Sequence, residues 1–214
     1  MGILPGISRR PCKSPNPPHI KPMTDTPRNQ ADFLGGKLLI ATPAMGDPRF
    51  HQAVILMCNH DSEQAFGIVI NKPMKSPRLP QLLSSLDLDG DKVADAPVLS
   101  GGPVDTQRGF VIHSADYIEE GSSIRATPDI NVTPTKGVLE AMASDVPPAR
   151  AVLALGYAGW GAGQLDREMM DNAWLVCPIT DGLVFETDAD DVWTRALGSI
   201  GVKPEMLSSI AGHA

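Results

Sequence analysis

The chain has few aromatic residues, few cysteines and no long apolar run. Its longest uninterrupted apolar segment, 53–58, has six residues, whereas a membrane-spanning helix needs about 20. Three cysteines cannot form the disulfide framework of a small secreted domain. Because the sequence shows neither a span nor the apolar region of a secretory signal, we expect a cytoplasmic protein.

Glycine and proline are each present 20 times, which predicts many turns and short elements instead of a helical bundle. Seven of the prolines lie within residues 1–30, together with five basic residues and one acidic residue, a net charge of +4. Proline at this density removes backbone donors and fixes φ, so 1–30 is predicted to be a disordered basic extension. An alternative start at Met23, with residues 1–22 not translated, stays open.

The rest of the chain, 31–214, is expected to form a single domain, and it is strongly acidic. It contains 13 Lys or Arg and 24 Asp or Glu, a net charge of −11, against −7 for the whole chain. Such a surface repels phosphate backbones. Direct nucleic-acid binding by this body is therefore not expected, and only the basic extension could contact phosphates.

Hydrophobic patterns along the body predict short strands and helices without a regular βαβ rhythm. Apolar runs joined by turn residues predict three antiparallel pairs: 52–58 with 65–70, 97–100 with 109–113, and 174–178 with 183–186 around Asp181-Gly182. Helical spacing and N-terminal caps predict helices at 79–88, at 134–143 after the cap Thr133, at 164–172, and after the cap Thr187. These elements predict a mixed α+β fold with mainly antiparallel pairing.

A glycine-rich segment between a predicted strand and a predicted helix is the main candidate for a ligand-binding site. Its residues are Gly159, Trp160, Gly161, Gly163 and Gln164, and free backbone N–H groups in such a place can hold an anion. The dinucleotide fingerprint needs glycine where Gln164 stands, and the Lys-Ser/Thr ending of a P-loop is absent. The glycines could instead let Trp160 pack over the start of the helix. Ligand binding and packing both stay open.

Cysteine and histidine residues are the next candidates for chemistry. A thiol nucleophile needs an imidazole within reach, and Cys58 and His60 share a strand face only if the strand persists to His60. Cys58 closes an apolar run, which is typical of a buried, inert thiol. His113 lies on another predicted strand, and Cys177 also has apolar neighbours. We assign no catalytic residue; the balance favours a protein that is not an enzyme, and an enzyme stays open as the alternative.

Metal-ligating patterns are absent from the sequence. The five histidines lack His-x-x-x-His spacing, and there is no Cys-x-x-Cys. The segment 87–91 looks like a calcium loop, but its glycine is fourth instead of sixth, and Val98 stands where the bidentate Glu belongs. We therefore predict no metal and no cofactor.

Several motifs, in order along the body, resemble the YqgE/AlgH family of bacterial proteins. They are Ala41–Phe50 (ATPAMGDPRF), Gly67–Pro73 (GIVINKP), Gly101–Val104 (GGPV), Arg108–Phe110 with His113, Gly156–Gly161 (GYAGWG), Gly163–Leu165 (GQL), Asn172–Trp174 (NAW) and Gly212–Ala214 (GHA). The resemblance runs from about Leu38 to Ala214. The extension 1–30 has no counterpart in the pattern.

The resemblance implies an α+β fold with a small closed β-barrel surrounded by helices, and no established activity or cofactor. The AlgH name carries a proposed role as a transcriptional regulator of exopolysaccharide production. The acidic body and the lack of a predicted helix-turn-helix argue against direct duplex binding. The first hypothesis is therefore a regulatory or interaction protein that acts through an unidentified protein partner or small ligand. The alternative is a small-molecule or nucleotide-binding protein, or an enzyme, that uses Gly159–Gln164.

Overall fold

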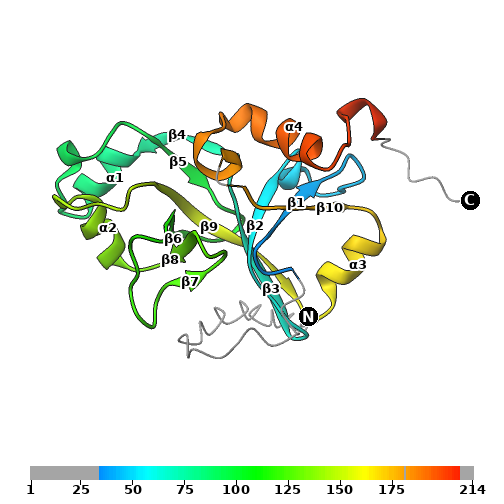
Figure 1. Ribbon diagram of the computed structural model, residues 1–214, viewed down its shortest axis with the longest axis horizontal. Coiled ribbons are helices and arrows are strands. Elements are labelled where there is room, and N and C mark those ends of the chain that lie inside the picture. The colour runs from blue at the N-terminus through cyan, green and yellow to red at the C-terminus, as the bar shows by residue number, and fades with distance from the viewer. Residues whose placement is uncertain (1–33, 181, 208–214) are drawn as a thin grey trace, which may run out of the picture.

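The computed structural model describes residues 34–180 and 182–207 (Figure 1). The predicted disordered extension over 1–30 and the alternative start at Met23 lie outside these residues. Asp181, predicted as part of a hairpin turn, lies outside them as well.

The described chain contains ten strands and four α-helices. The strands are β1 (Lys37–Ala41), β2 (Val54–His60), β3 (Gln64–Val69), β4 (Pro73–Arg78), β5 (Pro97–Ser100), β6 (Val104–Ser114), β7 (Ile124–Arg125), β8 (Ile130–Thr133), β9 (Ala151–Gly161) and β10 (Trp174–Pro178). The helices are α1 (Leu79–Ser85), α2 (Lys136–Met142), α3 (Gln164–Met170) and α4 (Ala189–Ser199), and a π-helical segment spans Gly182–Glu186. Most elements are short, as the glycine and proline content predicts.

The ten strands form one sheet in the order β10-β1-β2-β3-β9-β6-β8-β7, with β5 attached to β9 and β4 to β5. Every pair is antiparallel except β5 with β9. In the described chain the path ends at β10 and β7, which do not pair with each other. The prediction of a closed β-barrel is therefore wrong, and the strands form an open sheet. Short antiparallel strands suit either form, because closure depends on strand tilt and stagger, which local sequence does not specify.

Successive side chains of a strand point to opposite faces of the sheet, so the buried core is divided between the two faces. In β1, Leu38 and Ile40 belong to one buried cluster, whereas Leu39 and Ala41 belong to another. Helix α4 packs on the first cluster, and the Trp193 indole N–H donates to the carbonyl of Ala41 at 2.8 Å. A third cluster lies between the sheet and helices α1 and α2 (Figure 1). Burial on both faces explains why β2 begins with a continuous apolar run, Val54–Cys58.

Three local predictions are confirmed by the structure. The runs 52–58 and 65–70 form the hairpin of β2 and β3, the helix predicted at 79–88 is α1, which ends at Ser85, and the helix predicted at 164–172 is α3, which ends at Met170. No helix among the described residues is long and apolar enough to cross a bilayer.

Three other local predictions are wrong. The strand at 109–113, within β6, pairs with β8 and β9 and not with 97–100. Both predicted caps are displaced: Thr133 ends β8 and the cap of α2 is Thr135, and the cap of α4 is Asp188 and not Thr187. Residues 183–186 belong to the π-helical segment and not to a strand. Pairing partners and caps are decided by tertiary contacts, which override local propensity.

Candidate binding site

The chain crosses over β9 at Gly101-Gly102, and this crossing forms one end of the site. Before the crossing, the N–H and C=O of Gly101 bond to β9 and β3 at 2.7 and 2.8 Å. After it, Val104 pairs with Tyr157 on the opposite side of β9. A Cβ at Gly102 would lie 2.1 Å from the carbonyl carbon of Tyr157. Only glycine permits two backbones to approach so closely.

Beyond the crossing, β9 is paired on one side only. Residues 158–161 pair with β3, but the pairing of β9 with β6 ends at Tyr157. Because Gly102 covers the peptide between residues 157 and 158, the open edge that remains in the described chain consists of Gly159, Trp160 and Gly161. We call these three residues the β9 edge.

The backbone N–H and C=O groups of Gly159 and Gly161 point away from β3. Gln64, which lies opposite Gly161, uses its own N–H and C=O in bonds to Asp61 of 3.0 and 2.9 Å. The single N–H of Gln64 is therefore not available to the Gly161 carbonyl, and the Gly161 N–H donates to the Gln164 side chain. Since backbone direction alternates along a strand, the N–H and C=O of Gly159 also point to the open side.

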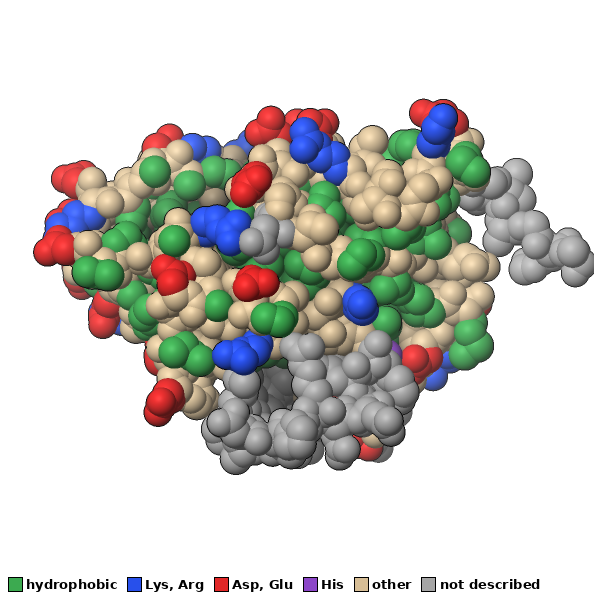
Figure 2. Space-filling view, viewed as in Figure 1, with side chains coloured by type: hydrophobic (Ala, Val, Ile, Leu, Met, Phe, Trp, Pro, Cys, Tyr) green, Lys and Arg blue, Asp and Glu red, His purple; other side chains and the backbone are tan. Residues whose placement is uncertain are grey.

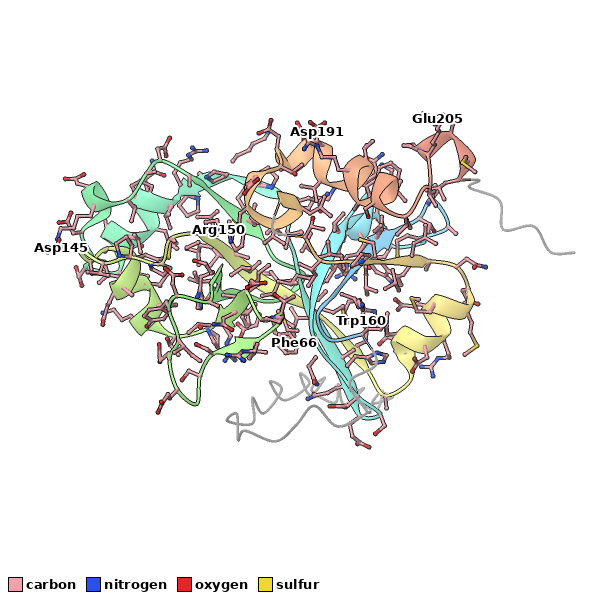
Figure 3. All side chains as sticks on the ribbon, viewed as in Figure 1. Phe66, Asp145, Arg150, Trp160, Asp191 and Glu205 are labelled. Carbon is pink, nitrogen blue, oxygen red and sulfur yellow. The ribbon has the colours of Figure 1, made fainter. Side chains whose placement is uncertain are left out.

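A cleft of about 220 Å³ lies beside the β9 edge. Its apolar lining includes Met45, Phe50, Val104 and Trp160, which come from three separate segments of the chain. Trp160 lies between the central strands and α3 (Figure 3). The β9 edge and the cleft therefore share a border.

Glu168 on α3 organises the polar lining on one side of the cleft. Its Oε2 accepts the indole N–H groups of Trp160 and Trp174, both at 2.8 Å. Its Oε1 accepts the side-chain amide of Gln164 at 2.9 Å. The two indole rings meet edge to face with centroids 6.0 Å apart. Charge-assisted bonds of this kind fix ring orientation, so this side of the cleft is preformed.

An ion pair between Asp47 and Arg49 lies on the other side of the cleft. The guanidinium donates from Nε and Nη2 to both carboxylate oxygens, and the Arg49 backbone N–H donates to Oδ1 at 3.0 Å. These bonds hold the pKa of the Asp47 carboxyl below its ordinary value. Asp47 is therefore ionised at neutral pH and is unsuited to general-acid catalysis.

The described residues that line the cleft are suited to binding. They include no Ser, Thr, Cys, Lys or His, so they supply no hydroxyl, thiol, amine or imidazole nucleophile. Both carboxylates, Asp47 and Glu168, already accept hydrogen bonds from protein donors. Apolar surfaces with a few fixed polar groups are typical of recognition sites.

The residues predicted from the glycine-rich segment lie together at this site. Gly159, Trp160 and Gln164 line the cleft, and Gly161 belongs to the β9 edge. Gly163, with φ +62°, forms the turn from β9 into α3. The segment is thus strand as far as Gly161, and the predicted loop is shorter than expected.

Seven further residues of the cleft are absent from the predicted set: Met45, Asp47, Arg49, Phe50, Pro103, Val104 and Glu168. The first four lie in the 41–50 motif that carries the family resemblance, and this motif was the signal that could have identified them. In the sequence, nothing distinguishes Glu168 from any other acidic residue of a predicted helix. Only the fold shows that its carboxylate is shared by two indoles.

Cys58, His60, His113 and Cys177 are buried, and none of them lines the cleft. The Cys58 thiol is 3.7 Å from the carbonyl oxygen of its neighbour Leu56. Burial raises the pKa of the Cys177 thiol. Buried thiols with raised pKa values are poor nucleophiles.

His113 ends a chain of buried hydrogen bonds. The Glu119 N–H donates to Ser123 Oγ at 2.8 Å, Ser123 Oγ is 2.7 Å from Thr133 Oγ1, and Thr133 Oγ1 is 2.8 Å from His113 Nε2. His113 Nδ1 is 2.9 Å from the carbonyl oxygen of Ser114, which can only accept, so Nδ1 carries the proton and Nε2 accepts. Burial lowers the pKa of His113. The neutral ring is therefore a structural element.

Metal-ligating side chains do not gather in groups of three or more within the part of the chain that the structure describes. In the segment 87–91, Asp89 caps a short 3-10 turn by accepting from the Asp91 N–H at 3.2 Å. The Asp89 carboxylate thus has a structural role in this turn.

Comparison with known proteins identifies the family of this chain. Residues 38–205 match the family model described as AlgH-like. A UPF0301 protein of Rhodopseudomonas palustris is 44% identical over 97% of this chain and 98% of that protein, and one of Caulobacter vibrioides is 40% identical over 87% and 96%.

Two solved structures have a similar fold. The solution structure of the AlgH protein from Pseudomonas aeruginosa has a TM-score of 0.68 and 34% identity, covering 90% of this chain and all of that one. A crystal structure of a Corynebacterium diphtheriae protein has a TM-score of 0.64 at 21% identity, covering 80% and 88%, and supports the fold alone. The chain belongs to the AlgH-like family.

Proposed function

We propose that this protein is a regulatory binding protein that recognises an extended segment of a partner protein at the β9 edge. In this proposal the segment pairs with Gly159 and Gly161 and places one side chain in the adjacent cleft. The observation that supports it most strongly is that the backbone groups of Gly159 and Gly161, which point away from β3, lie beside the cleft. Strand addition uses this combination: main-chain bonds supply affinity, and pockets for alternate side chains supply specificity.

The composition of the β9 edge supports this role. Proteins normally protect exposed strand edges with charged residues, proline or bulges. The β9 edge is Gly-Trp-Gly, and its pairing with β3 is regular. On its open side, the Gln164 side chain accepts the Gly161 N–H.

The size of the cleft favours a side chain over a large cofactor. Sites for drug-sized ligands measure about 300–1,000 Å³. The cleft measures about 220 Å³, and Phe50, Val104 and Trp160 supply apolar surface to it. We expect an apolar side chain of the partner to enter it.

The charge of the body favours a basic partner segment. Residues 31–214 carry a net charge of −11, and Figure 2 shows acidic side chains distributed over the visible face instead of in one cluster. Such a field steers cationic segments toward the protein and repels polyanions. A regulatory effect on transcription would therefore run through the protein partner and not through DNA. The cytoplasmic location stays a prediction.

Selection from a library of random nonapeptides, followed by calorimetric titration of the full chain, tests this proposal. We expect extended basic peptides with a central apolar residue to bind. N-methylation of alternate peptide nitrogens should abolish binding, because it removes main-chain donors and leaves the side chains intact. Equal binding by N-methylated peptides, or binding only by small anions, would refute strand addition.

A pair of matched variants locates the site. Val104→Arg places a long charged side chain in the cleft, whereas Val146→Arg makes the same change on an exposed loop. We expect Val104→Arg to lose peptide binding and Val146→Arg to keep it. Thermal melts of both variants separate lost binding from lost folding.

A further inference from the structure

We infer that the Gln164 side chain is a latch on the β9 edge, which must open before a partner strand can pair with Gly161. This inference rests on the proposed function and adds to it a residue that controls access. The latch is a positioning residue, because it acts through the backbone donor that it covers.

Two hydrogen bonds hold the Gln164 side chain in place. Its Oε1 accepts the Gly161 N–H at 3.2 Å, and its Nε2 donates to Glu168 Oε1 at 2.9 Å. The side chain thus bridges the end of β9 and the second turn of α3. An amide is the one common side chain of this length that can accept at one atom and donate at the other.

An incoming strand needs the same donor. A partner residue opposite Gly161 would present its carbonyl oxygen to the Gly161 N–H, which has a single proton to donate. Strand pairing at this position and the bond to Gln164 Oε1 therefore exclude each other. The exposed position of Gln164 leaves room for its side chain to rotate into solvent.

Opening of the latch also changes the surroundings of Trp160. The carboxylate that holds Gln164 accepts the Trp160 indole N–H through its other oxygen. Loss of the amide donor leaves Glu168 with more acceptor capacity for the indoles and for water. The indole of Trp160 therefore reports the state of the latch.

The variant Gln164→Ala removes the latch, and Glu140→Ala on the exposed face of α2 is its control. A typical net hydrogen bond corresponds to about a two- to tenfold change in an equilibrium constant. We expect peptides from the nonapeptide selection to bind Gln164→Ala about two- to tenfold more tightly than the unchanged chain. Glu140→Ala should bind as the unchanged chain does.

Amide hydrogen exchange tests the latch without any peptide. In Gln164→Ala the Gly161 amide should exchange faster by about two- to tenfold, and the Trp160 indole resonance should shift, with the Tm close to that of the unchanged chain. Unchanged exchange at Gly161 would overturn the latch.

The peptide titrations separate the two proposals. Peptides that bind both proteins equally overturn the latch and leave the proposed function standing. Failure of every peptide on both proteins overturns the proposed function, and the role of the latch with it.

Discussion

The variant Gly102→Ala should destabilise the fold severely, because this residue lies where the chain crosses β9. A Cβ there would meet the Tyr157 carbonyl carbon at 2.1 Å, its oxygen at 2.3 Å and the Ala158 nitrogen at 2.4 Å. All three are backbone atoms, so no side chain can rotate away. Ordinary contact begins near 3.4 Å, and β9 must move by more than about 1 Å.

The size of the effect follows from two contributions. Overpacking a core costs about 1–3 kcal/mol. Gly102 has φ +152°, and forcing a side chain into such a rarely populated conformation costs on the order of 1–3 kcal/mol more. The two contributions sum to about 2–6 kcal/mol, which is the fall that we expect in the free energy of unfolding. For a domain of this size that corresponds to a decrease in Tm of about 4–24 °C.

Gly161→Ala is the matched control within the β9 edge. A Cβ at Gly161 meets nothing within 4 Å, so the change should stay within about 0.5 kcal/mol. Differential scanning calorimetry measures both variants. A Gly102→Ala protein as stable as the unchanged chain, or a Gly161→Ala protein equally destabilised, would refute the steric reasoning.

Three further predictions concern Glu168, His113 and the buried thiols. Glu168→Ala leaves the indoles of Trp160 and Trp174 without their acceptor, so urea denaturation should show a loss of about 2 kcal/mol with altered tryptophan fluorescence, and Glu168→Gln, which keeps an acceptor oxygen, should lose less; equal losses would contradict the role of this side chain as the acceptor. The lowered pKa of His113 means that the unfolded chain takes up a proton below about pH 6.5 while the folded chain does not, so the free energy of unfolding should be constant above that pH and fall below it by up to about 1.4 kcal/mol per pH unit. His113→Gln should remove this component of the slope between pH 6.5 and 5.5, and a slope unchanged from the parent would count against it. Cys58 and Cys177 should stay unmodified by an alkylating reagent in the folded protein, as mass spectrometry would show, and rapid alkylation of either would contradict their burial.

The elements that were predictable from the sequence are those set by local patterns. The hairpin of β2 and β3 follows from two β-branched runs separated by a short polar turn. Helix α1 follows from leucines at helical spacing. The π-helical segment at 183–186 was missed, because its apolar run is short enough to suit a strand.

The candidate site was only partly predictable, because long-range pairing assembles it. Glycines after a buried strand pointed to Gly159–Gln164, and three of those residues line the cleft. The Asp47–Arg49 pair reaches the same cleft from the connection between β1 and β2, more than 100 residues away in the chain. The open edge exists because β6 stops pairing at Tyr157, a register that no local signal specifies.

Isotope-edited NMR of the full chain with a selected nonapeptide tests the central claim most directly. Strand addition predicts NOEs between peptide backbone protons and the amides of Gly159 and Gly161, together with slower exchange of those amides. Peptide contacts confined to other surfaces, with the Gly159 and Gly161 amides unchanged, would contradict the account.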